Sequence, residues 1–241
     1  MSMKQSTVAV VDLGLLSHSG ESAIDMPPFR RIGCQTLLER TIRRLSECLR
    51  LDAIAITGSS EFSAHIQQSH LQPSRWLPSD EFAPLARVAD VVWQLDAELA
   101  VLVSPSCPFI DPLLVDRLVT AAWGSPEADF VAFASQSRPT FSLDGLGLVA
   151  EVIHRRVLRR LGKDQRFSND PRRIPDLVRS MPEVFQARLL PLPSTLDRED
   201  LRFVLENEDD WERAHQIVEA SGNDYDYQDL AVLAGNIDCN R

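Results

Sequence analysis

The chain has 241 residues, a length that fits one large domain or two small ones and can bury a core without disulfide or metal staples. Its apolar fraction of 44% and charged fraction of 25% are those of a globular protein, which excludes disordered and fibrous classes. Asp and Glu outnumber Lys and Arg by 35 to 25, and no long basic run is present, so we exclude a nucleic-acid binder.

The N-terminal region and the cysteines indicate a reduced, cytoplasmic protein without a membrane segment. Residues 7–13, TVAVVDL, form a β-branched run typical of a strand buried on both faces of a parallel sheet. No apolar signal core precedes this strand, and no apolar run approaches the roughly 18 residues of a membrane helix. Because Cys34, Cys48, Cys107 and Cys239 are widely spaced, with no C-x-x-C pair, we expect free thiols rather than a zinc site or disulfides.

Strands and helices then alternate as far as residue 134. Residues 14–33 form a long aperiodic loop, of a length usually found in functional loops. The expected elements after it are a helix over 35–49, a strand over 53–57, a helix capped by Ser60 through about residue 70, an edge strand over 75–78, a helix over 82–95, a strand over 99–103, a helix over 113–123 opened by Pro112, and a strand over 130–134. This alternation predicts helices on both faces of a mostly parallel sheet.

The order of elements changes beyond Ser135. We expect a strand over 148–153, a helix over 154–161, a polar connection over 162–175, strands over 185–192 and 201–205, and an amphipathic helix over 208–220. The tail after Gly222 is polar and is expected to contribute little to the core. No internal repeat or linker is visible, so we expect a single domain over residues 1–241.

The most specific motif of the chain is SPSCPFIDP, at residues 104–112. It resembles the strand-turn-helix of sugar cytidylyltransferases, roughly N-A-D-C-P-L-I-D-P, in the branch that contains the spore-coat polysaccharide biosynthesis protein F family, CMP-sialic-acid synthetases and CMP-KDO synthetases. Further segments resemble the family in the same order, namely 37–45 (LLERTIRRL), 85–87 (LAR), 144–146 (DGL) and 200–211 (DLRFVLENEDDW). Together the matches cover most of residues 6–220.

The resemblance implies a three-layer α/β/α nucleotide-diphospho-sugar transferase fold and the transfer of CMP from CTP to a sugar acid for surface polysaccharide. It also implies Mg²⁺ as cofactor and a homodimer formed near residues 135–152. Because ligands of open α/β sheets bind outside the carboxyl ends of the strands, we expect the nucleotide there. The expected nucleotide-binding residues are Leu13, Gly14, Ser17, Arg30, Arg31, Ser59, Arg87 and Ser106. The acceptor sugar is expected to face Asp144 and the later segment.

The sequence departs from the family in the loop that would hold the phosphates. The family's basic loop, R-x-x-S-x-R-L-P-x-K, is replaced after the first strand by residues 12–20, DLGLLSHSG, and the family's Lys falls near Pro27. Arg30 and Arg31 are close enough in sequence to substitute as phosphate clamps. The alternative is that they are two solvated arginines before a helix.

The metal-binding positions also differ from the family. Ser106 stands at the position of one metal-binding aspartate and Glu206 at that of the other, so Glu206 is the candidate metal ligand. Glu206, Asp111 and Asp144 are the candidate catalytic carboxylates. A hydroxyl cannot match the charge of a carboxylate, so the affinity for Mg²⁺ is expected to fall.

Two functions therefore stay open. The chain is either a divergent cytidylyltransferase in which Glu206, Asp111 or Asp144 carries the metal, or an inactive homologue that acts as a nucleotide- or sugar-binding or scaffold protein. Asp111 also has a structural interpretation, because it stands directly before Pro112, where a helix cap is expected. Other α/β nucleotide-binding classes have less support, since neither a dinucleotide-binding nor a P-loop glycine motif occurs.

Overall fold

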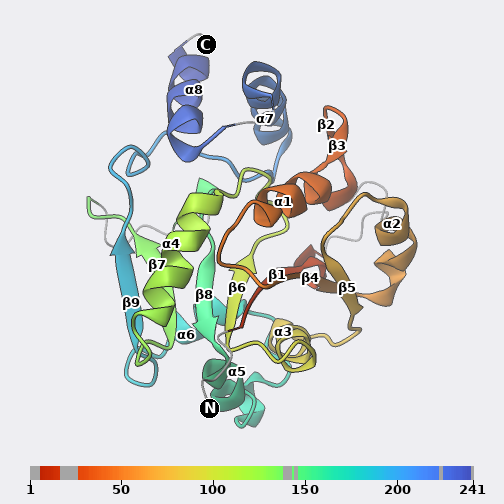
Figure 1. Cartoon of the computed structure of the whole chain (residues 1–241), viewed down its shortest axis with the longest axis vertical. Helices are drawn as coiled ribbons and strands as arrows, with labels where there is room; N and C mark the ends of the chain where they lie inside the picture. The colour runs from red at the N-terminus through yellow and green to blue at the C-terminus, as the bar shows by residue number, and fades with distance from the viewer. Residues whose placement is uncertain (1–5, 17–26, 138–142, 144–145, 223–224, 240–241) are drawn as a thin grey trace.

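The computed structural model describes residues 6–16, 27–137, 143, 146–222 and 225–239. Its centre is a seven-stranded sheet with the order β5-β4-β1-β6-β8-β7-β9 (Figure 1). The strands are β1 Thr7–Asp12, β4 Ala53–Gly58, β5 Arg75–Pro78, β6 Leu99–Val103, β7 Phe130–Ala134, β8 Glu151–His154 and β9 Ala187–Pro191. Only β8 runs antiparallel to its neighbours in this sheet, so the expected mostly parallel α/β architecture is confirmed.

Helices cover both faces of the sheet and make three layers (Figure 1). One face carries α1 Leu37–Ser46, α2 Ser63–Gln68, α4 Pro112–Trp123, α7 Glu208–Ser221 and α8 Tyr227–Cys239. The other carries α3 Pro84–Gln94, α5 Arg155–Leu161 and α6 Ile174–Arg179. Strands between these layers have apolar side chains on both sides, which explains the continuous apolar run of β1.

Local sequence signals fix where the main helices begin. Thr36 and Glu39 form a capping box at the start of α1, in which each side chain bonds the backbone N–H of the other residue. Asn207 and Asp210 form the same reciprocal arrangement at the start of α7. Helix α3 begins with Pro84. Proline has no backbone N–H, but in the first turn of a helix this group would have no intrahelical acceptor, so its absence costs no hydrogen bond.

The C-terminal part of the chain differs from the prediction in three places. Residues 201–205 belong to no strand, although most of their side chains are buried. The connection over 162–175 ends in α6, a helix that the sequence analysis did not anticipate. The tail was expected to lie outside the core, but it forms α8, and Leu230, Ala231 and Ala234 are buried in the main apolar cluster.

Smaller corrections concern the edges of elements. The strand expected over 148–153 begins only at Glu151, and Ser59 rather than Ser60 caps the short 3-10 turn Ser60–Phe62 that precedes α2. Ahead of α1, the short strands Arg31–Ile32 (β2) and Gln35–Thr36 (β3) form an antiparallel hairpin. Among the described residues, no helix combines the length and apolar character needed to cross a membrane.

Candidate functional site

The parallel pairing of β1 with β4 and β6 brings the carboxyl ends of three strands to one edge of the sheet. Leu13 begins a short 3-10 turn, Leu13–Leu16, directly after β1. Ser59 follows β4, and Ser104 follows β6. Residues 40 or more positions apart therefore meet at this edge, as the sequence analysis expected for a nucleotide site.

A crevice opens beside the turn after β1 and encloses about 720 Å³ of space that is open to solvent. Its lining residues are Gly14, Ser59, Glu61, Ser79, Asp80, Glu81, Phe82 and Arg87. Asp80 accepts hydrogen bonds from the backbone N–H of Ser60 and from the hydroxyls of Ser59 and Ser60. These hydrogen bonds, the one from the Ser60 backbone first, lower the pKa of Asp80, so the crevice carries a fixed negative charge at neutral pH.

Arg87 of α3, which lines this crevice, forms a buried ion pair with Asp12, at the end of β1. Arg87 Nε lies 2.8 Å from Asp12 Oδ1, and Arg87 Nη2 lies 2.9 Å from Asp12 Oδ2. Arg87 Nη1 also donates to the carbonyl oxygens of Glu81 and Phe82. Four of the five guanidinium N–H donors are thus directed at the protein itself, so Arg87 positions the crevice walls instead of offering an open phosphate clamp.

Burial raises the pKa of the Asp12 carboxyl in spite of the Arg87 guanidinium that opposes this effect. Asp12 Oδ1 also accepts from the backbone N–H of Gly14, which ties the turn after β1 to the ion pair. A Cβ atom on Gly14 would lie 2.4 Å from Arg87 Cζ. Glycine is therefore required at this position for the close approach of the guanidinium, independently of any phosphate.

On the other side of the ion pair, two adjoining shallow hollows lie at the end of β6, and their volumes of about 450 and 430 Å³ include space that is open to solvent. Leu102, Ser104, Glu151 and Arg173 line both of them. Asp12 lines the first hollow, whereas Arg87 lines the crevice, so the ion pair forms the wall between the two spaces. Neither Glu151 nor Arg173 was predicted as a site residue, because Glu151 lies in an expected strand and Arg173 in a stretch that was interpreted only as a polar connection.

A backbone hydrogen bond joins the segments that carry Ser106 and Glu206, the two positions at which the sequence resemblance places metal-binding residues. The backbone N–H of Leu205 donates to the carbonyl oxygen of Ser106 at 3.2 Å. Gly147 packs on the same segment at a φ of +70°, and a Cβ there would lie 2.5 Å from the Phe203 carbonyl carbon. Gly147, which follows the DGL segment, and residues 203–204 are therefore neighbours in space, whereas Asp144 and Ser17 lie outside the described residues.

The donors at this point do not fit a Mg²⁺ site. Glu206 is ion-paired with Arg202, at 2.6 Å between Oε2 and Nη2, and Arg202 is held in turn by Asp210 at 2.9 Å. These two hydrogen-bonded carboxylates raise the pKa of Arg202, which therefore stays charged. No group of three potential ligands occurs in the part of the chain that the structure describes. One carboxylate already neutralised by arginine is a poor ligand set for a hard divalent cation.

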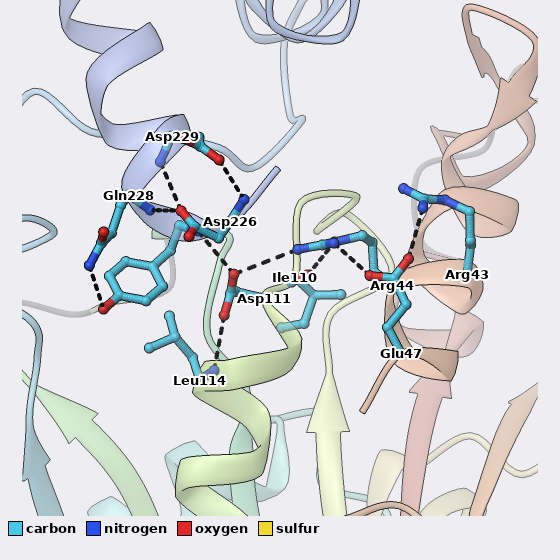
Figure 2. A network of polar contacts seen from close by, with 10 residues as sticks. Arg43, Arg44, Glu47, Ile110, Asp111, Leu114, Asp226, Gln228 and Asp229 are labelled. Atoms are coloured by element: carbon cyan, nitrogen blue, oxygen red, sulfur yellow. Dashed lines mark hydrogen bonds and ion pairs between the residues drawn. The ribbon is translucent and has the colours of Figure 1, made fainter. Parts of the chain in front are cut away.

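Asp111, the second predicted catalytic carboxylate, makes contacts within the fold. It is completely buried and accepts from the backbone N–H of Leu114 at 3.0 Å and from that of Tyr227 at 3.0 Å. Arg44 of α1 lies 3.6 Å from its Oδ2 atom. Figure 2 shows the resulting network, which joins α1, α4 and the start of α8. The capping interpretation of Asp111 is therefore confirmed, and its side chain is completely buried, whereas its catalytic role stays a prediction.

Arg30 and Arg31, the predicted phosphate clamps, are engaged elsewhere. Arg30 forms two bonds with Glu208, of 2.6 and 2.8 Å, and stacks over the ring of Trp211 at 4.3 Å. Arg31 donates to the carbonyl oxygen of Cys34. Neither residue lines the crevice or the two hollows. Of the predicted nucleotide-binding residues, the structure gathers Gly14, Ser59 and Arg87 at the crevice, with Leu13 in the adjoining turn.

The sequence matches no family model and no curated protein. Solved structures do resemble the fold. A cytidylyltransferase from Leptospira borgpetersenii superposes with a TM-score of 0.81 at 15% identity, covering 97% of this chain and 94% of that one. A CMP:2-keto-3-deoxy-manno-octonic acid synthetase complexed with CTP gives 0.63 at 11% identity, covering 90% of this chain and 99% of that one.

A third similar structure is Rv0371c from Mycobacterium tuberculosis in complex with manganese, with a TM-score of 0.59 at 15% identity. It covers 87% of this chain and 97% of that chain. At such identities the likeness establishes the fold alone. The chain has a nucleotide-diphospho-sugar transferase-like α/β fold, which confirms the fold expected from the SPSCPFIDP segment.

Proposed function

We propose that this chain binds a nucleoside triphosphate, with CTP as the first candidate, and that the reaction open to it is the transfer of CMP to a sugar. The single observation that carries this proposal is the crevice at the carboxyl ends of β1 and β4, in a fold shared with cytidylyltransferases. The homodimer, the single domain and the cytoplasmic location expected from the sequence stay predictions.

The chemistry of the crevice suits the nucleoside end of the ligand. Its carboxylates and serine hydroxyls are acceptors for ribose hydroxyls and for the exocyclic amine of cytosine. Phe82, whose side chain is exposed, offers a ring on which a base can stack. Asp80 and Glu81 would repel a triphosphate, so the phosphates are expected to extend away from them along the turn Leu13–Leu16.

A second candidate function is that of a catalytically inactive homologue that binds a nucleotide or sugar, or serves as a scaffold. The observations that favour it are the Glu206–Arg202 ion pair, the burial of Asp111, and the scarcity of lysine. The whole chain contains only two lysines, Lys4 and Lys163. The lysine of the family that the chain resembles therefore has no counterpart near residues 12–31. An inactive homologue that binds a nucleotide would share the crevice with the transferase and differ from it in turnover.

Isothermal titration with CTP tests the shared claim, and a pyrophosphate-release assay with sugars separates the two candidates. Phe82→Ala is expected to weaken CTP binding by about 1–3 kcal/mol, the usual value of one base stacked on an aromatic ring. Leu49→Ala is the matched control, because Leu49 is an apolar side chain 88% exposed outside the crevice. Equal CTP affinity in wild type and Phe82→Ala would contradict the crevice as the nucleoside site.

CTP binding accompanied by pyrophosphate release would establish the transferase. CTP binding without release, for every sugar and with Mg²⁺ or Mn²⁺ present, would establish the inactive homologue. The metals are included in this assay because the resemblance to the family implies a divalent cation, although the described residues of this chain contain no ligand set for one.

A further inference from the structure

Strand β9 lies at the outer edge of the central sheet, beside β7 (Figure 1). The carbonyl oxygen of Gln186 and the N–H of Leu192 both form hydrogen bonds with the backbone of β7. Because the residues of a strand direct their backbone groups alternately to its two sides, Ala187 and Leu189 direct theirs away from β7. Pro191, which has no N–H, faces the same outer side, as proline does in edge strands. No described strand pairs with this side, so the backbone groups of Ala187 and Leu189 are available to an added strand.

The side chains of β9 alternate between two faces of the sheet. Arg188 and Leu190 face helix α4, and together with residues of that helix they line a groove of about 750 Å³, a volume that includes space open to solvent. Leu189 lies on the opposite face, and its side chain is 57% exposed. A strand added beside β9 would therefore meet a cation on one face of the sheet and an exposed leucine on the other.

The groove between α4 and β9 carries positive charge that the protein does not neutralise. Arg188 Nη1 donates to the carbonyl oxygen of Ala121 at 3.2 Å and to the hydroxyl of Ser125, near the end of α4. Arg117 of α4 lies over the ring of Phe133, with its Cζ atom 5.3 Å from the ring centre. No carboxylate lines the groove, and neither arginine forms an ion pair within the part of the chain that the structure describes. In a chain of net charge -10, this groove is the kind of surface that attracts an acidic partner.

A second copy of this chain fits the outer side of β9 poorly. Pairing two β9 strands about a two-fold axis would bring both copies of Arg188 to the same face of the joined sheet, where like charges repel. Pro191 would leave one donor missing on each strand. A charged side chain and a proline at a sheet edge are among the devices that prevent the pairing of identical edges. The occupant that the charges favour is therefore a different chain with acidic side chains.

We propose that β9 and this groove bind an extended segment of a partner protein in which acidic and apolar side chains alternate. The segment adds a strand to the sheet through the backbone groups of Ala187 and Leu189. Its acidic side chains lie on the α4 face, next to Arg188 and Arg117, and its apolar side chains cover Leu189 on the other face. None of these four residues lines the nucleoside crevice, so the site is independent of the proposed function.

Fluorescence anisotropy with a labelled synthetic peptide that alternates Glu and Val tests the proposal, and peptides that alternate Lys and Val or Gln and Val are the comparisons. Each exposed charge pair changes the affinity a few-fold, so the Glu–Val peptide is expected to bind about tenfold more tightly than the Lys–Val peptide. Raising the salt concentration is expected to reduce this difference, because salt screens exposed charges. No binding of the Glu–Val peptide, or equal binding of all three peptides, would overturn the proposal.

Arg188→Glu reverses the charge of the edge strand. The variant is expected to bind the Lys–Val peptide more tightly than the Glu–Val peptide, a reversal that a merely structural role of Arg188 does not produce. Arg117→Gln is expected to weaken Glu–Val binding about two- to fivefold, since one exposed charge pair is lost. Arg75→Gln is the matched control, because Arg75 is an exposed arginine on β5, the strand at the opposite edge of the sheet. An unchanged peptide preference in Arg188→Glu, or equal losses in Arg75→Gln and Arg117→Gln, would contradict the proposed site.

Leu189→Pro tests the backbone contacts. The substitution removes one outward N–H and leaves the bonds to β7 intact, as Pro191 does in the native chain, so the variant is expected to fold, which circular dichroism checks. Binding of the Glu–Val peptide should fall about tenfold or more in Leu189→Pro and less in Leu189→Ala, which keeps the N–H. A Glu–Val peptide with N-methylated amides makes the same test on the wild-type protein and does not depend on the folding of a variant. Unchanged binding of the methylated peptide, or of the Glu–Val peptide to folded Leu189→Pro, would overturn the proposal.

Analytical ultracentrifugation of the protein alone tests for a second copy at the same edge. We expect the state of association of the wild-type protein and of Leu189→Pro to be the same. A dimer that Leu189→Pro dissociates would identify a second copy as the occupant of β9 and would overturn the proposal of an acidic partner.

Discussion

Replacing Arg87 by Leu tests the interpretation of Arg87 as the group that holds the crevice together. The variant leaves the Asp12 carboxylate buried without its cation and the carbonyl oxygens of Glu81 and Phe82 without their donor. Breaking a buried ion pair by removing one partner costs about 3–5 kcal/mol. For a protein of this size, 1 kcal/mol corresponds to about 2–4 °C, so the melting temperature is expected to fall by about 6–20 °C.

The loss of stability in Arg87→Leu should depend on pH, in a direction that follows from the titration of Asp12. Burial raises the pKa of Asp12 in the folded protein above its value in the unfolded chain. The folded state therefore gains stability from this carboxyl at a pH below the unfolded pKa, where the carboxyl is protonated. That contribution is lost as the pH rises through the folded pKa. Without Arg87 the pKa of Asp12 rises further. The difference in unfolding free energy between wild type and Arg87→Leu is therefore expected to be larger at pH 7 than at pH 4.

Urea denaturation followed by circular dichroism measures this difference at both pH values. Arg166→Leu is the control, because Arg166 is 79% exposed and pairs with Asp164 on the surface, where ion pairs contribute little to stability. The double variant Asp12→Asn/Arg87→Leu is expected to regain part of the lost stability, since no unpaired charge stays buried. A loss below about 1 kcal/mol for Arg87→Leu, or a larger loss at pH 4 than at pH 7, would refute the reasoning.

Three further predictions test other parts of the account. Gly147→Ala should destabilise the protein by more than Gly222→Ala, in urea denaturation, because both residues have a positive φ but only at Gly147 would a Cβ meet the backbone of residues 203–204; equal losses would contradict this. Asp111→Ala should lower the unfolding free energy by about 3–5 kcal/mol, as expected for an uncompensated buried partner, and a fully stable but inactive variant would restore its catalytic interpretation. Leu230→Ala should cost about 2–5 kcal/mol in thermal or urea unfolding, whereas Val232→Ala, 63% exposed on the same helix, should stay within about 0.5 kcal/mol of wild type; similar losses would mean that α8 is not part of the core.

Strand positions were predictable because buried parallel strands are short apolar runs, and β1, β4, β6 and β7 all have this pattern. Residues 201–205 show the limit of that rule. Most of their side chains are buried, but the backbone pairs with no strand: Leu205 bonds to Ser106, and Gly147 packs on residues 203–204. Apolar burial and strand pairing are separate properties, and only the first is visible in a sequence.

The location of the candidate site was also predictable, since the carboxyl ends of parallel strands define it. The partners of its charged side chains were not. Arg87 pairs with Asp12 across 75 positions, and Asp111 contacts Tyr227 across 116. A charged residue in a motif looks the same in a sequence whether it faces a substrate or a distant partner. For this reason the internal contacts of Asp111, Arg30 and Glu206 could not be anticipated from the sequence, and the functional roles of these residues stay predictions.

Thermal unfolding with CTP, UTP, ATP and GTP in turn is the most direct test of the central claim, that the fold binds a nucleotide in the crevice beside β1. A ligand that binds only the folded state at about a hundredfold over its dissociation constant adds about 2.7 kcal/mol, or about 5–10 °C here. We predict such a rise with CTP in wild type and in Leu49→Ala, and a smaller rise in Phe82→Ala. No rise with any of the four nucleotides, with or without a divalent cation, would contradict the claim.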